Sequence, residues 1–217
     1  MGWTLVWSGL LMLGFVGYQL YGTGLQTAAA QADAREELAK VFASASTTST
    51  TPTTAPADAS TTTTQPPILV GEEPVGEGEP FAQIRMPSID VDQIVFEGVQ
   101  VETLKQGPGR IPGTSLPGQP GNAGISGHRT TYGQPFHDLD RLRPGDSIFV
   151  DTAIGTHEYI VRRSEIVTPF DVDVLDQRDG AWLTLTTCHP KYSARQRLIV
   201  FAEMVDGPNL EAIAAGV

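Results

Sequence analysis

The sequence predicts an all-β domain, either a sandwich or a barrel, between about Phe81 and Val205. Short runs rich in β-branched residues recur in this region, and each run is closed by Gly, Pro, Asn or Asp. This pattern is typical of strands that are joined by turns. Only short helical stretches, such as FHDLDRL at residues 136–142, interrupt the runs. Seven or eight strands in roughly 125 residues favour a sandwich or a barrel.

The expected strands follow one another along the chain with one long interruption. Residues 107–122, GPGRIPGTSLPGQPGN, contain too many glycines and prolines for a central strand, so we expect a loop or single turns that pass over the sheet. Loops of this length in compact domains are usually functional. The expected strands are FAQIRMPSI (81–89), DQIVFEGVQ (92–100), NAGISGHRT (122–130), DSIFVDTAI (146–154), HEYIVRRSEIV (157–167), AWLTLTT (181–187) and RLIVFAEMV (197–205).

The strand AWLTLTT shows a clear alternation of apolar and polar residues. Leu183 and Leu185 share one face, which we expect to lie in the core, whereas Thr184, Thr186 and Cys188 share the other. A core cysteine would be in phase with the leucines. The alternation therefore predicts that Cys188 points away from the layer that the leucines occupy.

Composition excludes several classes of function. The net charge is -11 at pH 7, so the chain has no basic face with which to bind nucleic acid. Its 217 residues are enough for one domain with a substantial core plus appendages. Cys188 is the only cysteine, which excludes a disulfide within the chain.

The N-terminal residues predict a membrane anchor over residues 1–24. Residues 3–22, WTLVWSGLLMLGFVGYQLYG, carry no charge, and a helix of this length reaches about 30 Å, the thickness of the hydrocarbon core of a bilayer. A cleaved signal peptide is the competing interpretation, with Ala28 to Ala30 near the cut site, but the apolar run is longer than usual for one. The first basic residue, Arg35, follows the span, so the positive-inside rule alone does not support export.

The region after the anchor predicts a spacer that holds the domain away from the membrane. Residues 25–42 are rich in Ala, Glu and Gln and predict a juxtamembrane helix. Residues 43–79 form a Ser/Thr/Pro-rich and then acidic linker, which cannot bury a core and is expected to be disordered. The domain boundaries are then 80–207 for the β-domain and 208–217 for a C-terminal tail.

Cys188 has one good candidate for a proton-transfer partner. A thiol nucleophile needs a base that takes and returns its proton. His137 and His157 lie in polar segments typical of the surface, and His189 is expected to point away from Cys188 because the two are adjacent in a strand. His128 remains, at the end of a strand-like run where side chains face a cleft.

Two arginines could stabilise the oxyanion that forms on an attacked carbonyl. Arg195 and Arg197 have the same parity along the chain, but Arg197 abuts the apolar run LIVFA and is better placed to enter a groove. A bulge after Pro190 would exchange their roles. The sequence has no metal-binding motif such as C-x-x-C or H-E-x-x-H, and we expect neither metal nor cofactor.

The motifs TLTTC at residues 184–188 and RLIV nine residues after the cysteine, with an upstream Gly-His, resemble the sortase signature. The segments GHRTTYGQPFHDLDRLRPGD and TLTTCHP are most similar to class E sortases of actinobacteria, with class D or F as alternatives. The resemblance covers residues 84–203, and the anchor and tether match the layout of the family.

The resemblance implies a closed eight-stranded β-barrel and a membrane-anchored cysteine transpeptidase on the cell-wall side of the membrane. Such enzymes cut a C-terminal sorting signal, LAxTG-like or LPxTG-like, between Thr and Gly. They then join the Thr carbonyl to an amine of the cell-wall precursor through a thioester. Cys188 would be the nucleophile, His128 the general acid and base, and Arg197 the oxyanion donor, while Thr187 would help to position the bound signal.

Two further interpretations remain open, namely a cysteine hydrolase that releases its acyl product and a non-catalytic barrel that binds peptide or cell wall. In the catalytic case, the thiolate would be favoured by a protonated His128 and by Arg197. The loops at residues 107–122 and 164–180 are expected to shield the groove from water.

Overall fold

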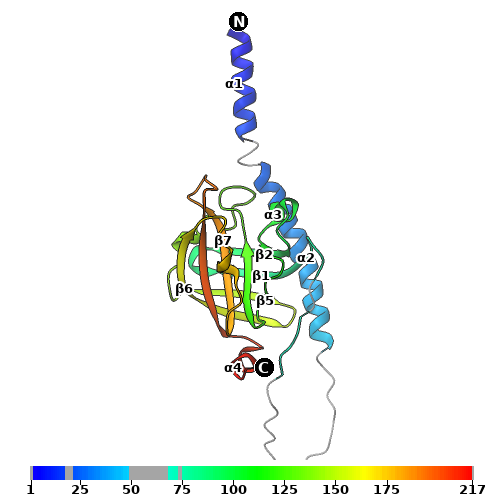
Figure 1. Ribbon diagram of the computed structural model, residues 1–217. Helices are drawn as coiled ribbons and strands as arrows, with labels where there is room; N and C mark the ends of the chain where they lie inside the picture. The colour runs from blue at the N-terminus through cyan, green and yellow to red at the C-terminus, as the bar shows by residue number, and fades with distance from the viewer. Residues whose placement is uncertain (1, 18–21, 49–67, 73–74, 217) are drawn as a thin grey trace, which may run out of the picture.

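Eight strands of the described chain close into a β-barrel in the computed structural model (Figure 1). The structure describes residues 2–17, 22–48, 68–72 and 75–216. Around the barrel the order is β1-β2-β3-β4-β7-β8-β6-β5. The predicted all-β fold and the closed eight-stranded barrel are therefore confirmed. The strands are β1 (Pro80–Met86), β2 (Val91–Glu97), β3 (Gly109–Arg110), β4 (Gly121–Ser126), β5 (Ser147–Thr152), β6 (Gly155–Val167), β7 (Ala181–His189) and β8 (Gln196–Asp206).

Helices precede the barrel and connect its strands. The helical stretch expected at residues 136–142 is one 3-10 turn, and the expected C-terminal tail includes a short helix beside the end of β8 (Figure 1). The helices are α1 (Gly2–Gly17), α2 (Thr23–Thr48), α3 (Val101–Gln106) and α4 (Leu210–Ala214), and the 3-10 helices are η2 (Pro87–Ile89), η3 (Leu139–Arg141) and η4 (Val172–Leu175).

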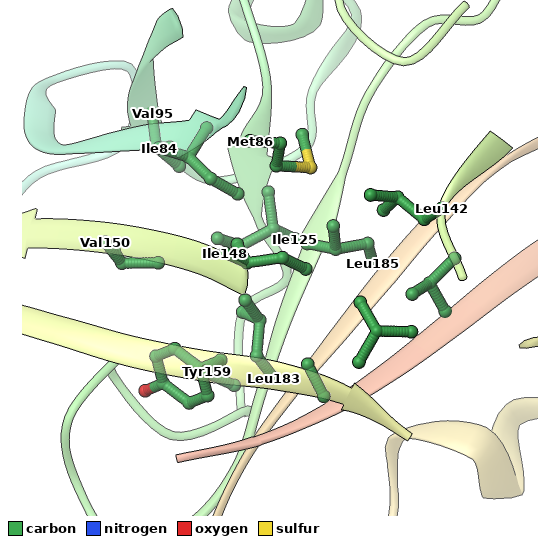
Figure 2. Close-up of a cluster of buried hydrophobic side chains, with 14 of the residues drawn as sticks. Ile84, Met86, Val95, Ile125, Leu142, Ile148, Val150, Tyr159, Leu183 and Leu185 are labelled. Atoms are coloured by element: carbon green, nitrogen blue, oxygen red, sulfur yellow. The ribbon is translucent and has the colours of Figure 1, made fainter. Parts of the chain in front are cut away.

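The core fills the inside of the barrel. Leu183 and Leu185 of β7 are fully buried there, as their phase predicts, and they pack with Ile125 of β4, Ile148 of β5 and Tyr159 of β6 (Figure 2). Because side chains alternate along a strand, burial of the leucines turns Cys188 to the outside of the barrel. There it is half-buried, and it is a free thiol.

One part of the Gly/Pro-rich segment is a strand, and the prediction that this segment contains no central strand was wrong. β3 lies between β2, which it pairs with in parallel, and β4, which it pairs with antiparallel. The reason is a buried ion pair: the Arg110 guanidinium donates to both carboxylate oxygens of Glu97, its partner on β2, at 2.6 Å each. This bidentate pair holds two residues of otherwise weak strand propensity in the sheet.

Helix α2 packs along the outside of the barrel against α3, β1 and β2 (Figure 1). Its Ala34 and Leu38 are buried against Ile94 and Phe96 of β2. The Gln31 amide accepts from the Ile94 N–H at 2.7 Å and donates to the Ile94 carbonyl at 3.0 Å. Since β3 covers only the last residues of β2, Gln31 satisfies backbone groups that would otherwise form an open edge. The helix expected over residues 25–42 lies within α2, and it is part of the globular domain.

The predicted anchor and tether lie only partly in the described chain. Helix α1 has 16 residues and covers the apolar segment from Trp3 to Gly17, while residues 18–21 lie outside the described residues. No helix among the residues that the structure describes is long and apolar enough to cross a bilayer. Of the linker expected over residues 43–79, residues 49–67 and 73–74 also lie outside the description.

Candidate active site

The parallel pairing of β4 with β7 brings His128 beside Cys188. Ser126, at the end of β4, is in register with Thr186 of β7. The pairing continues one step further, since the Gly127 N–H donates to the Thr186 carbonyl at 3.1 Å. His128 lies two residues after Ser126, and Cys188 lies two residues after Thr186. Both residues line one hollow at the surface. The structure thus joins two residues that are 60 positions apart in the sequence.

The antiparallel pairing of β7 with β8 places Arg197 directly opposite Cys188. Residues that are directly opposite in an antiparallel pair carry their side chains on the same face, with Cβ atoms about 4.5–5.5 Å apart. Arg195 lies before the start of β8, in the turn, and is exposed. The register therefore favours Arg197 over Arg195 as the arginine beside the thiol.

Cys188 lines one hollow at the surface, and Arg197 lines a second. The first, of about 350 Å³, is lined mainly by polar residues and opens between the segment after β4 and the β7–β8 turn. It is lined by His128, Arg129, Thr130, Thr131, Cys188, Tyr192, Ser193 and Ala194. The second, of about 120 Å³, is lined mainly by apolar residues and lies between the β6–β7 connection and β8. It is lined by Val167, Thr168, Pro169, Asp171, Val172, Val174, Leu175, Thr186, Arg197 and Ile199.

Of the two loops expected to shield the groove, one borders it. Residues 167–175 form a wall of the second hollow. Residues 107–122, all of which the structure describes, are absent from the lining of both hollows. Around Gly118 this segment is held near α4 instead, since Asn209 donates to the Gly118 carbonyl at 2.9 Å. That end of the barrel is opposite the β7–β8 turn (Figure 1).

Burial sets the protonation of His128. Removal from water disfavours the imidazolium and lowers the pKa of His128 below its ordinary value. Near neutral pH the neutral imidazole, which can accept a proton, therefore predominates. This differs from the sequence-based expectation of an imidazolium that stabilises a thiolate, because the sequence did not reveal that the ring is partly buried.

Thr187 is buried and points into the barrel. Its side chain is in phase with Leu183 and Leu185 and is only 2% exposed. Its hydroxyl donates to the Gly127 carbonyl at 2.7 Å. The resemblance implied that Thr187 helps to position a bound signal, and its burial means that it would do so through the residues that it holds. Thr187 ties the strand of the thiol to the residue that precedes His128.

Arg129 is a residue of the site that the sequence did not reveal. It is 2% exposed, and its guanidinium donates to the Cys188 carbonyl at 3.3 Å and to the His137 carbonyl at 3.3 Å. It also contacts Nδ1 of His189 at 2.9 Å and pairs with Asp140 at 3.0 Å. A turn has no apolar periodicity from which the burial of Arg129 could be predicted. Only the pairing of β4 with β7 brings Arg129 to Cys188. Arg129 therefore fastens the segment of His128 to the strand of the thiol.

We expect Arg129→Met to lower the free energy of unfolding by about 2–3 kcal/mol, because charge-assisted hydrogen bonds are lost from a buried position. Urea unfolding followed by circular dichroism measures the effect. The matched control is Arg141→Met, since Arg141 is exposed and its pair with Asp138 contributes at most about 1 kcal/mol. Equal unfolding midpoints for the two variants would contradict the assigned role of Arg129.

The other histidines do not join Cys188 as bases. The expectation that His157 lies at the surface was wrong: it is fully buried, its Nε2 lies 3.2 Å from the Thr152 hydroxyl, and burial lowers its pKa to about 4. His137 is half-buried and bonds to the Arg129 carbonyl, and His189 bonds to the Arg129 guanidinium. Within the described parts of the chain, no three His, Cys, Asp or Glu side chains are grouped closely enough to hold a metal ion.

Comparison with known proteins places this site in a family. The sortase domain matches residues 84–205. The sortase SrtE1 of Streptomyces coelicolor is 29% identical over 92% of this chain and 54% of its own length, so the chain spans about half the length of this relative. Among solved structures, sortase E from Streptomyces avermitilis is 36% identical with a TM-score of 0.56, over 61% of this chain and 91% of that one.

A further structure bears on the site itself. Sortase E1 from Streptomyces coelicolor, solved with a tripeptide in its active site, is 32% identical with a TM-score of 0.57, over 59% of this chain and 90% of that one. The residues that the sortase domain matches include His128 after β4, Cys188 on β7 and Arg197 on β8. The chain belongs to the sortase family and is class E-like.

Proposed function

We propose that the protein is a cysteine transpeptidase that cleaves a C-terminal sorting signal, LAxTG-like or LPxTG-like, between Thr and Gly and joins the Thr carbonyl to an amine of the cell wall. The observation that carries this proposal is the convergence of three side chains at one end of the barrel. His128 follows β4, Cys188 is the second-to-last residue of β7, and Arg197 is the second residue of β8, in register with Cys188.

The first half of the reaction forms a thioester. Neutral His128 takes the proton of the Cys188 thiol as the sulfur attacks the Thr carbonyl, and the resulting oxyanion accepts hydrogen bonds from the Arg197 guanidinium. The imidazolium then donates the proton to the departing Gly amine. The C–N bond breaks, and the acyl group remains on Cys188.

The second half transfers the acyl group. An incoming amine attacks the thioester carbonyl, and His128 accepts a proton from the amine. As the C–S bond breaks and the new amide forms, His128 returns this proton to the departing Cys188 sulfur, which restores the thiol and the neutral imidazole. The two hollows offer separate places for the two substrates. We assign the sorting signal to the hollow beside Arg197, where most lining residues are apolar, and the amine to the hollow beside His128, where most lining residues are polar. The tripeptide in the active site of the Streptomyces coelicolor relative supports a peptide ligand at this end of the barrel.

The proposed place of action is the outer face of the cell membrane, with the apolar segment 3–22 as a single-pass anchor and a lipid bilayer as its partner. This rests on the absence of charge in that segment and on the Thr/Pro-rich residues after α2. The proposed protein partners are secreted proteins that bear the sorting signal.

The amine dependence of the products tests the proposal. An LAxTG-containing peptide is incubated with the full chain, with and without glycinamide, and the products are identified by mass spectrometry. We expect the Thr–glycinamide conjugate to dominate when the amine is present, and slow release of the free Thr acid without it. Release of the acid at the same rate in both cases would identify a cysteine hydrolase, and binding without cleavage would identify a non-catalytic barrel.

A further inference from the structure

The segment after His128 follows an unusual backbone path. Tyr132, Gly133 and Gln134 have φ values of 50°, 72° and 53°, so three consecutive residues lie in the left-handed region. Non-glycine residues rarely adopt this conformation, and it persists where the surrounding structure holds it in place. Such backbone is concentrated at functional sites.

Tyr132 is packed between His128 and α3. Its ring lies against the His128 ring, with centroids 5.0 Å apart and planes tilted by 43°. The Nζ atom of Lys105, in the last turn of α3, lies 6.0 Å from the centroid of the Tyr132 ring, within range of a cation–π interaction. The Tyr132 ring therefore lies between the His128 imidazole and helix α3, which contributes no residue to the proposed reaction.

Helix α2 supports this arrangement from outside. A Cβ atom on Gly133 would lie only 2.9 Å from the Thr27 side-chain methyl, so the loop sits directly on α2. The Thr27 hydroxyl donates to the Lys105 carbonyl at 2.8 Å, and the Gln31 amide donates to the Gln106 carbonyl at 3.0 Å. Through these contacts α2, α3 and the segment of His128 form one packed unit.

We propose that Tyr132 is a positioning residue for His128 and that α2 holds Tyr132 in place through its contacts with Gly133 and α3. The proposal rests on the role proposed above for His128 as acid and base. It makes the helix that precedes the barrel a part of the catalytic apparatus, because a shift of α2 would move the imidazole relative to Cys188.

The environment of the imidazole supplies a direct readout. The charged and titratable groups around His128 are Tyr132 and Arg129 on its own segment, Cys188 on β7, Tyr192 in the β7–β8 turn, and Lys105 on α3 beyond the Tyr132 ring. Burial lowers the pKa of His128, and the tilted Tyr132 ring lies against the imidazole. Removal of that ring admits water, so the pKa of His128 rises toward its ordinary value.

Substitutions at Tyr132 test the proposal. We expect Tyr132→Ala to lower kcat at least about tenfold with little change in KM, because a misplacement of about 1 Å in a catalytic group can cost up to about 10²-fold. Tyr132→Phe keeps the ring and is expected to restore kcat. NMR titration of His128 is expected to show a higher pKa in Tyr132→Ala but not in Tyr132→Phe. Wild-type kcat and titration in Tyr132→Ala would overturn the proposal, as would a rise in KM alone.

A second pair of variants tests the role of α2 without touching the site. Gly133→Ala places a methyl group against Thr27 and, at a φ of 72°, also strains the backbone, so we expect it to lower kcat. Adding Thr27→Ser removes the opposing methyl but keeps a hydroxyl for the Lys105 carbonyl, so we expect partial recovery of kcat. No recovery, with both variants folded by circular dichroism, would contradict the link from α2 to His128.

Failure of this inference can be told apart from failure of the proposed function. If wild-type protein cleaves the peptide but His128→Ala cleaves equally well, the role of His128 is wrong. If His128→Ala is inactive and Tyr132→Ala matches wild type in kcat and in the His128 titration, only the positioning role is wrong.

Discussion

Cys188→Ala is expected to abolish cleavage of an LAxTG peptide, lowering the rate by about 10³-fold or more, as loss of a catalytic nucleophile does in other acyl-transfer enzymes. The thiol is half-buried outside the barrel, in a hollow that His128 also lines, so alanine removes the sulfur without opening a cavity in the core. The measurement is peptide cleavage followed by chromatography. Circular dichroism and thermal unfolding show whether the variant is folded.

A thiol-reactive peptide mimic separates a missing nucleophile from a damaged site. We expect it to label wild-type protein at Cys188, to leave Cys188→Ala unlabelled, and to label His128→Ala slowly, because the imidazole no longer takes the proton. Cleavage by Cys188→Ala at the wild-type rate would refute the proposed mechanism. Labelling of His128→Ala at the wild-type rate would instead remove His128 from the first step.

The all-β fold and the places of two proposed site residues within it could be predicted because local pattern determines them, whereas the closed barrel was implied by the resemblance to sortases. The alternation through Leu183 and Leu185 fixes which face of β7 is buried, and it therefore turns Cys188 outward. The position of His128 at the end of a strand is equally local. The choice between Arg195 and Arg197 needed the register of β7 with β8, which no periodicity in the sequence specifies.

The features that the sequence did not reveal depend on partners that are distant in the chain. β3 forms because Arg110 pairs with Glu97 of β2, whereas strand propensity alone predicts a loop at these residues. The sequence predicted a spacer where α2 lies, because the hydrogen bonds of Gln31 to the Ile94 backbone of β2 cannot be inferred without the structure. His157 and Arg129 are polar residues in polar segments, and their burial follows from tertiary packing alone.

Arg197→Ala is expected to lower kcat by about 10²–10³-fold, the usual cost of removing one oxyanion donor. In the structure, Nη1 of Arg197 donates to the carbonyls of Ala194 and Gln196, at 2.9 and 3.0 Å. These two bonds fix the plane of the guanidinium, which has five N–H donors in all. Among the contacts of the described residues, the N–H groups of Nε and Nη2 remain to serve the oxyanion and the backbone of the signal.

Arg195→Ala is the matched control, because Arg195 carries the same charge two residues away but lies in the exposed turn before β8. We expect it to retain kcat close to that of wild type, which would rule out a general loss of positive charge as the cause of the Arg197 effect. Arg197→Lys keeps the charge without the planar fork and is expected to fall between wild type and Arg197→Ala. Steady-state kinetics on the LAxTG peptide measures all three. A larger loss of kcat in Arg195→Ala than in Arg197→Ala would mean that Arg195, in the turn, binds the oxyanion. The β7–β8 register would then have to change when the signal binds.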